Sequence, residues 1–113
     1  MDEASKSIRA SALSTLAFLA SPDAQREFAS KVHYANYQSE FACWWFDTFI
    51  PEAYDCFTAN ELPILKEFSA IFDASLHDLS DTPTTIEQLL ATETWRKIVT
   101  DASRACASLR VQA

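Results

Sequence analysis

Apolar residues recur along most of the chain at intervals of three and four positions, the spacing that gathers them on one side of an α-helix. The clearest stripe lies near the C-terminal end and consists of Trp95, Ile98, Val99, Ala102, Ala105, Cys106 and Leu109. A second stripe consists of Leu62, Ile64, Leu65, Phe68, Ile71, Phe72 and Leu76. No alternating run of β-branched residues is long enough to require a strand. The pattern therefore predicts an all-α fold.

Capping residues indicate where the helices begin. The first helix is expected from about residue 4 to residue 20, and its buried side should hold Ile8, Ala12, Leu16 and Leu19. Ser21 and Pro22 suit the start of a short second helix, since serine caps the free N–H groups and proline fits the first helical position. Thr58 to Glu61 and Thr85 to Gln88 each match a capping box, so further helices should begin there. A loop is expected over residues 79–85.

The third helix, predicted over about residues 37–50, is unusually aromatic. Phe41, Trp44, Trp45, Phe46 and Phe49 cover more than half of its circumference, so most of this helix should be surrounded by protein. Pro51 ends it, and residues 51–58 are expected to form a linker. Together these segments predict a compact single-domain bundle of about five helices spanning residues 1–113.

Length and composition limit the classes of function. The 113 residues suffice for one domain, carry a net charge of −7 and include no glycine. Without glycine the chain has no phosphate-binding loop of the Walker or dinucleotide type. Its acidity argues against nucleic-acid binding, and no stretch of about 18 apolar residues suggests a membrane span. We therefore expect a protein partner rather than nucleic acid or membrane.

The negative charge is concentrated in the middle of the chain. Residues 40–93 contain a single base, Lys66, and eleven acids, which are Glu40, Asp47, Glu52, Asp55, Glu61, Glu67, Asp73, Asp78, Asp81, Glu87 and Glu93. Glu61, Glu87 and Glu93 have local explanations near helix starts. Most of the others have none, although acidity can also serve only to keep a small protein soluble. A one-signed surface of this kind speeds association with a basic partner.

Trp44 and Trp45 point about 100° apart on a helix, so they face either two separate packing surfaces or one core and one interface. Trp44 lies beside Glu40 and Asp47, and aromatic anchors ringed by charge are typical of binding sites. The resulting hypothesis is a partner-binding surface formed by Glu40, Trp44, Asp47, Glu52, Tyr54, Asp55, Asp73, Asp78 and Asp81.

Catalytic and metal chemistry find little support in the spacing of the residues. A nucleophile could come from Cys43 or Cys56 with His33, but no third residue that would orient the pair is identifiable. The same three residues lack the close ligand pairs typical of structural zinc. We expect a protein without catalytic activity, cofactor or metal. Three widely spaced cysteines favour a reducing compartment, hence the cytoplasm. The alternative is secretion, because Lys6 and Arg9 precede an apolar run over residues 12–20.

Three stretches, FASKVHYANYQSEFACWWFDTFIPE, FTANELPILKEFSAIFD and TIEQLLATETWRKIV, resemble small bacterial immunity proteins. These are the antidotes of contact-dependent inhibition and related polymorphic toxin systems, and the resemblance covers about residues 26–102. It implies a cytosolic, non-enzymatic protein that binds the C-terminal domain of a cognate toxin, often a nuclease with a basic cleft. The main alternative is a helical adaptor or structural protein that self-associates, so a homo-oligomer is also considered.

Overall fold

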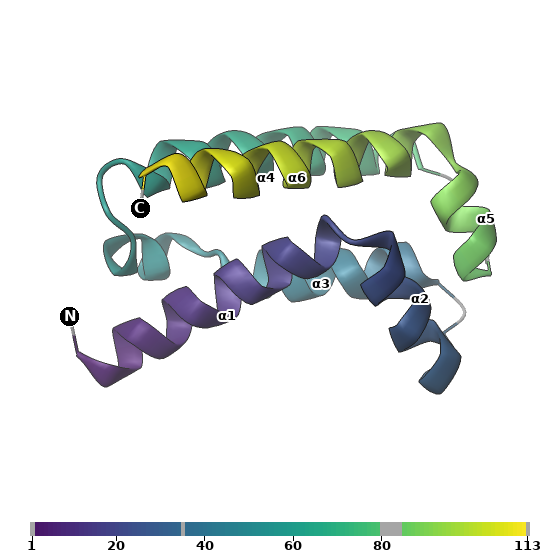
Figure 1. The fold of residues 1–113 in the computed structure, drawn as a ribbon, viewed down its shortest axis with the longest axis horizontal. Coiled ribbons are helices and arrows are strands. Elements are labelled where there is room, and N and C mark those ends of the chain that lie inside the picture. Colours follow the sequence, from purple (N-terminus) through teal and green to yellow (C-terminus); the bar gives the residue numbers. More distant parts are fainter. Residues whose placement is uncertain (1, 35, 80–84, 113) are drawn as a thin grey trace.

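The computed structural model describes residues 2–34, 36–79 and 85–112, and within them it contains helices and no strand (Figure 1). The helices are α1 (Glu3–Leu19), α2 (Pro22–Lys31), α3 (Tyr37–Thr48), η1 (Pro51–Cys56), α4 (Glu61–Leu76), α5 (Ile86–Ala91) and α6 (Glu93–Gln112). The all-α prediction is confirmed. The prediction of about five helices is wrong, since the described residues form seven. The expected loop over residues 79–85 falls mostly outside the described residues.

The expected linker after Pro51 is instead a 3₁₀ helix, η1. Pro51 stands at its first position, where its fixed φ suits a helical turn. Ala53 and Cys56 are buried three residues apart, which is one turn of a 3₁₀ helix. Burial of these two side chains therefore holds the segment against the core. The same turn points Glu52 and Asp55 to solvent.

The long helices form two stacked pairs (Figure 1). Helices α4 and α6 run antiparallel along one side of the molecule, and α1 and α3 run antiparallel along the other. α2 and α5 close one end, while η1 lies at the opposite end together with the start of α1. The radius of gyration of 14.1 Å is near the roughly 13 Å of a compact domain this size. The prediction of a compact bundle is therefore confirmed.

One continuous hydrophobic cluster fills the space between the pairs. Its largest fully buried side chains are Trp45, Trp95, Phe41, Phe72, Leu16, Leu19, Leu65, Leu89 and Ile98. Apart from Ile71, the residues of the stripes predicted for α4 and α6 belong to this cluster or pack against it. Ile8 was also expected in the core, but 39% of it is exposed. At its level, α1 borders a surface groove beside η1 rather than the core.

The predicted caps are confirmed where the structure describes them. The Ser21 hydroxyl accepts the backbone N–H of Ala24 at 3.1 Å, which begins α2. Thr85 and Gln88 form the reciprocal bonds of a capping box at α5. Thr58 accepts the Glu61 N–H at 3.1 Å and donates its own N–H to the Glu61 carboxylate at 3.0 Å. These bonds satisfy backbone donors that a helix start leaves free.

A buried glutamine joins three helices. Gln25 is completely buried, and its Nε2 donates to the carbonyl oxygens of Phe18 and Leu19, both at 3.1 Å. Its Oε1 accepts the indole N–H of Trp95 at 3.0 Å. The amide therefore links the end of α1 and the body of α2 to the beginning of α6. The bonds to Leu19 and Trp95 are buried, which makes their loss costly.

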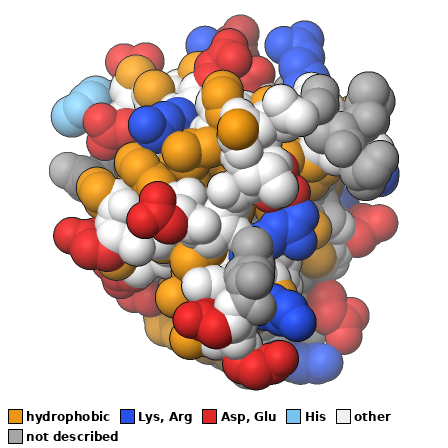
Figure 2. Space-filling model, turned by 90° about the vertical axis from the view of Figure 1, so that its left-hand side faces the viewer, with side chains coloured by type: hydrophobic (Ala, Val, Ile, Leu, Met, Phe, Trp, Pro, Cys, Tyr) orange, Lys and Arg blue, Asp and Glu red, His pale blue; other side chains and the backbone are white. Residues whose placement is uncertain are grey.

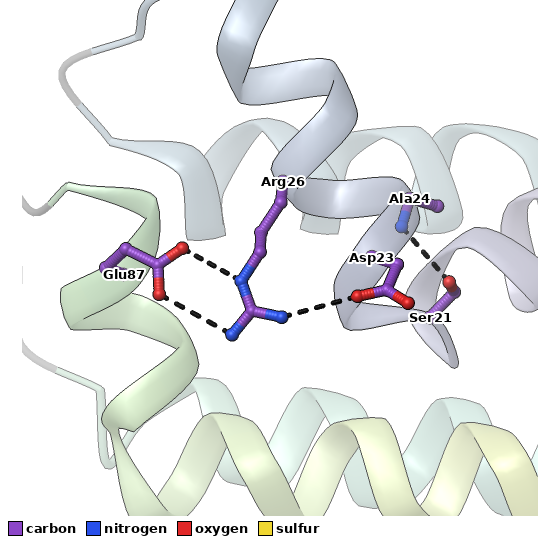
Figure 3. A network of polar contacts seen from close by, with 5 residues as sticks. All are labelled: Ser21, Asp23, Ala24, Arg26 and Glu87. Atoms are coloured by element: carbon purple, nitrogen blue, oxygen red, sulfur yellow. Dashed lines mark hydrogen bonds and ion pairs between the residues drawn. The ribbon is translucent and has the colours of Figure 1, made fainter.

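On the surface nearby, Arg26 of α2 reaches Glu87 of α5 (Figure 3). Its Nε lies 2.8 Å from a Glu87 carboxylate oxygen, and its guanidinium also contacts Asp23 at 3.4 Å. The side chains of Arg26 and Glu87 are 47% and 65% exposed, so this pair contributes little to stability. Among the described residues, no helix combines the length and the apolar character needed to cross a membrane.

Candidate partner-binding surface

Asp47 and Glu52 lie on the same surface groove, as the hypothesis of a shared surface requires. The groove has a volume of about 340 Å³ and lies between the first half of α1, the end of α3 and η1. Its lining consists of Ser7, Ile8, Ser11, Asp47, Thr48, Ile50, Glu52 and Ala53. We call it the Asp47–Glu52 groove.

The turn from α3 into η1 determines this geometry. Helix α3 ends at Thr48, and the Phe49 ring stacks on Trp45 with centroids 5.1 Å apart. Phe49 is therefore buried while the next residue, Ile50, is 37% exposed. Pro51 then starts η1, which buries Ala53 and leaves its neighbour Glu52 outside. The groove is thus lined by the apolar side chain of Ile50, just before η1, and by the acidic side chain of Glu52 in η1.

The charges in this groove are uncompensated. Asp47 and Glu52 are both exposed, and across the described ranges neither carboxylate lies within ion-pair distance of a lysine or arginine. The exposed isoleucines Ile8 and Ile50 line the same groove. Covering apolar surface releases roughly 25 cal/mol per Å² on binding, whereas the carboxylates select the sign of the partner's charge. The groove can therefore bind a surface that is both apolar and basic.

Tyr54 and Asp73 meet in a second hollow, which also contains the one base of the acidic region. This hollow has a volume of about 430 Å³ and lies between the end of α3, η1 and α4. Lys66 holds its Nζ 4.7 Å from the centroid of the Tyr54 ring, a cation–π contact. The other face of Tyr54 is packed near Phe49, with centroids 5.1 Å apart. Tyr54 is thus held in place, and this hollow carries both signs of charge.

The two adjacent tryptophans face two packing surfaces. Trp45 is fully buried and donates its indole N–H to the Ser69 hydroxyl at 3.1 Å. Trp44 is half-buried and packs on Phe18 and Phe28, with ring centroids 5.4 and 4.9 Å away. Trp44 therefore serves the aromatic cluster between α1, α2 and α3. Only its exposed edge is left for a partner.

The remaining members of the expected surface are spread along the molecule. Glu40 is half-buried in the first turn of α3, Asp55 is exposed in η1, and Asp78 is exposed just after α4. Asp81 lies outside the described residues. Figure 2 shows the end of the molecule where η1 lies, and there Asp and Glu alternate with Lys and Arg around exposed apolar side chains. The structure therefore groups Asp47 with Glu52 and Tyr54 with Asp73, rather than forming one continuous acidic patch.

Sequence reasoning missed the two isoleucines of the groove. Ile8 fits the apolar spacing of α1 just as a core residue does. Only its place relative to the neighbouring helices shows that it lines a groove instead. Ile50 directly precedes Pro51, which favours an extended conformation and could have indicated a residue outside the helix. The pattern also gave no sign that Arg9 would bind Glu61, 52 residues away.

The Arg9–Glu61 pair removes one acid from the available negative charge. The two side chains form a bidentate contact, in which Arg9 Nε lies 3.1 Å from a Glu61 oxygen. The Glu61 side chain is only 9% exposed. Arg9 lowers the pKa of this carboxyl, burial opposes that change, and the Thr58 cap lowers the pKa further. Glu61 is therefore structural, as expected for a capping residue.

The cysteines and His33 do not form an evident reactive group. Cys43 is exposed on α3, whereas Cys56 is buried with the core. Burial raises the pKa of the Cys106 thiol, which disfavours its nucleophilic form. His33 is exposed between α2 and α3. Across the part of the chain that the structure describes, no group of three or more His, Cys, Asp or Glu could hold a metal ion.

Comparison of the chain with protein-family models, curated proteins and solved structures gave no match. The Asp47–Glu52 groove combines free carboxylates with exposed apolar side chains, and this is the chemistry of a protein-binding site.

Proposed function

We propose that this chain is an immunity protein that binds a basic toxin domain in the bacterial cytoplasm and blocks it by steric and electrostatic occlusion. The observation that carries the proposal is the Asp47–Glu52 groove, where unpaired carboxylates border exposed Ile8 and Ile50. The resemblance of the sequence to immunity proteins supports the same reading. Under this proposal the partner is the C-terminal domain of a cognate toxin, a nuclease with a basic substrate cleft.

The expected mode of action follows from charge and shape. The acidic groove attracts lysines and arginines that otherwise bind phosphate, and this attraction raises the association rate at low salt. The isoleucines then lose contact with water and slow dissociation. An antidote bound in this way excludes nucleic acid from the cleft without performing any chemistry.

The test is a binding measurement with two matched double variants. Asp47→Asn with Glu52→Gln removes two charges from the groove, and Asp23→Asn with Glu93→Gln removes two exposed charges near the opposite end. At about 1 kcal/mol for each groove carboxylate, the first variant should weaken toxin binding roughly 30-fold at low salt. The control should bind like the unmodified chain.

Three results would count against this proposal. They are equal losses in both variants, affinity that does not change with salt, and the absence of any complex with the C-terminal domain encoded next to this chain. Equal losses would show that only the net charge matters. Affinity that ignores salt would exclude a basic partner, and the absence of a complex would exclude the toxin as the partner.

Self-association is the second candidate, and it is favoured by the same exposed isoleucines. Two copies could cover Ile8 and Ile50 against each other, although Asp47 and Glu52 would then repel across the contact. Light scattering over a range of protein concentrations separates the two candidates. A mass that doubles with concentration, and that returns to the monomer value in Ile50→Ser, would favour the adaptor.

A further inference from the structure

Asp101 of α6 has a mostly buried carboxylate with an incomplete set of partners. Its side chain is 12% exposed, and its Oδ2 is buried without a hydrogen bond among the described residues. The other oxygen lies 3.6 Å from Nη1 of Arg104, which is too long for a hydrogen bond. Arg104 itself is 77% exposed, so water weakens even this attraction.

Two other buried polar side chains, Gln25 and Glu61, are well satisfied. Gln25 uses both ends of its amide, and Glu61 binds Arg9 and the Thr58 backbone. A carboxylate removed from water without such bonds costs the folded state free energy. An unsatisfied group of this kind calls for an explanation, such as strain, a bound water or ion, a partner or a chemical role. Asp101 therefore calls for an explanation that the free fold does not supply.

Asp101 lines a groove of about 240 Å³ between α4 and α6. Its lining consists of Ile64, Glu67, Phe68, Ile71, Asp101, Arg104, Ala105 and Ser108. Glu67 is exposed at this groove, and within the described ranges no lysine or arginine pairs with it. This α4–α6 groove shares no residue with the Asp47–Glu52 groove.

We infer that the α4–α6 groove binds a lysine or arginine side chain of a protein partner. The methylene stem of that residue packs on Ile64, Phe68 and Ile71, and its cationic head pairs with the Asp101 carboxylate in place of Arg104. Long basic side chains combine an apolar stem with a charged tip in this way. Glu67 supplies a second carboxylate, and the exposed Arg104 moves aside into water.

Charge complementarity selects this occupant. An anionic group would face two carboxylates, Asp101 and Glu67, against one base, Arg104. A purely apolar group would take the Asp101 carboxylate further out of water without giving it a hydrogen bond. A basic side chain satisfies the carboxylate and covers the apolar walls together. The site does not depend on the toxin proposal, because its ligand is defined by the groove alone.

The binding test uses the whole chain and two small probes, N-acetyl-lysine methylamide and N-acetyl-arginine methylamide. Nuclear magnetic resonance titrations should show saturable shifts at Ile64, Ile71 and Ala105 at probe concentrations on the order of 50 mM. Asp101→Asn should abolish them, whereas the control Glu93→Gln, an exposed acid in the first turn of the same α6, should retain them. An uncharged probe, N-acetyl-norleucine methylamide, should bind at least tenfold more weakly. Shifts that persist in Asp101→Asn, or no saturable shift, would overturn the inference.

Thermal unfolding provides a second test, because Asp101→Asn should raise Tm if Asp101 binds a ligand but not if its role is only structural. If Asp101 is kept for a ligand, Asp101→Asn removes a mostly buried carboxylate oxygen that lacks a hydrogen bond and raises Tm by a few degrees. If Asp101 serves only its contact with Arg104, both Asp101→Asn and Arg104→Ala lower Tm or leave it unchanged. That second pattern would overturn the inference. Neither experiment contains a toxin, so their failure is distinct from failure of the proposed function.

Discussion

Replacing Gln25 by leucine should be one of the most damaging single changes in this fold. The substitution keeps the approximate size of a completely buried side chain but removes its three hydrogen bonds. The Phe18 carbonyl still accepts the N–H of Ser21 at 3.1 Å, so that group keeps a partner. The Leu19 carbonyl loses its bond to Gln25, and the buried indole N–H of Trp95 loses its acceptor.

The expected magnitude follows from these groups. A net hydrogen bond contributes about 1 kcal/mol, and a buried donor left unsatisfied costs about 1–3 kcal/mol. We therefore expect Gln25→Leu to lower the free energy of unfolding by about 2–4 kcal/mol. For a domain of this length the corresponding fall in Tm is roughly 8–16 °C.

The assay is urea denaturation followed by far-ultraviolet circular dichroism, with a double-mutant cycle as its control. Trp95→Phe removes the indole donor but keeps a large ring. If Gln25 and Trp95 interact as described, the double variant should lose about 1–2 kcal/mol less than the sum of the single variants. A loss below about 0.5 kcal/mol for Gln25→Leu, or strictly additive losses, would refute the reasoning.

Three further predictions concern acid stability, thiol reactivity and a helix cap. Because the pKa of Glu61 is lowered in the folded protein, its contribution to stability is present above its unfolded pKa of about 4.3 and is lost as pH falls through the lower folded value. Glu61→Gln should flatten that acid dependence in urea titrations, while the exposed Glu67→Gln should leave it unchanged. Under native conditions a thiol reagent should modify exposed Cys43 rapidly and buried Cys56 only after unfolding, and equal rates would contradict the described burial. Thr85→Ala should cost about 1 kcal/mol by removing the α5 capping box, and an unchanged denaturation midpoint would show that the cap is dispensable.

Local rules account for most of the helical boundaries. The capping signals at Ser21, Thr58 and Thr85 needed only neighbouring residues, so they could be read directly from the chain. The stripe on α6 was equally accessible, because its period matches one helix facing one core. Such features depend on interactions between residues three or four positions apart. The local sequence is therefore enough to predict them.

The features that were missed depend on distant parts of the chain. Burial of Ala53 and Cys56, which converts a linker into η1, requires a core that other helices provide. In the sequence Gln25 resembles a solvent-facing residue. Its buried amide oxygen accepts the indole N–H of Trp95, which lies 70 positions later. Ile8 lies on a groove because of how the end of α3 and η1 are placed beside α1. Tertiary contacts of this kind have no local signal.

The candidate surface was predicted only in part for the same reason. Asp47 and Glu52 are close in sequence, so a turn between them could be expected to place both on one groove. Asp73 meets Tyr54 only because α4 packs beside η1 and α3. Trp44 resembled an exposed anchor because its neighbours Glu40 and Asp47 are acidic, but the ring packs on α1 and α2.

The measurement that tests the central claim most directly is co-purification of this chain with the C-terminal toxin domain encoded beside it. One partner carries the tag, and the complex is washed at low and high salt. We predict a 1:1 complex that weakens with salt, restores growth of cells expressing the toxin, and is bound roughly 30-fold more weakly by Asp47→Asn with Glu52→Gln. A complex that ignores this double variant would contradict the location of the binding surface. Absence of both complex and rescue would contradict the immunity function.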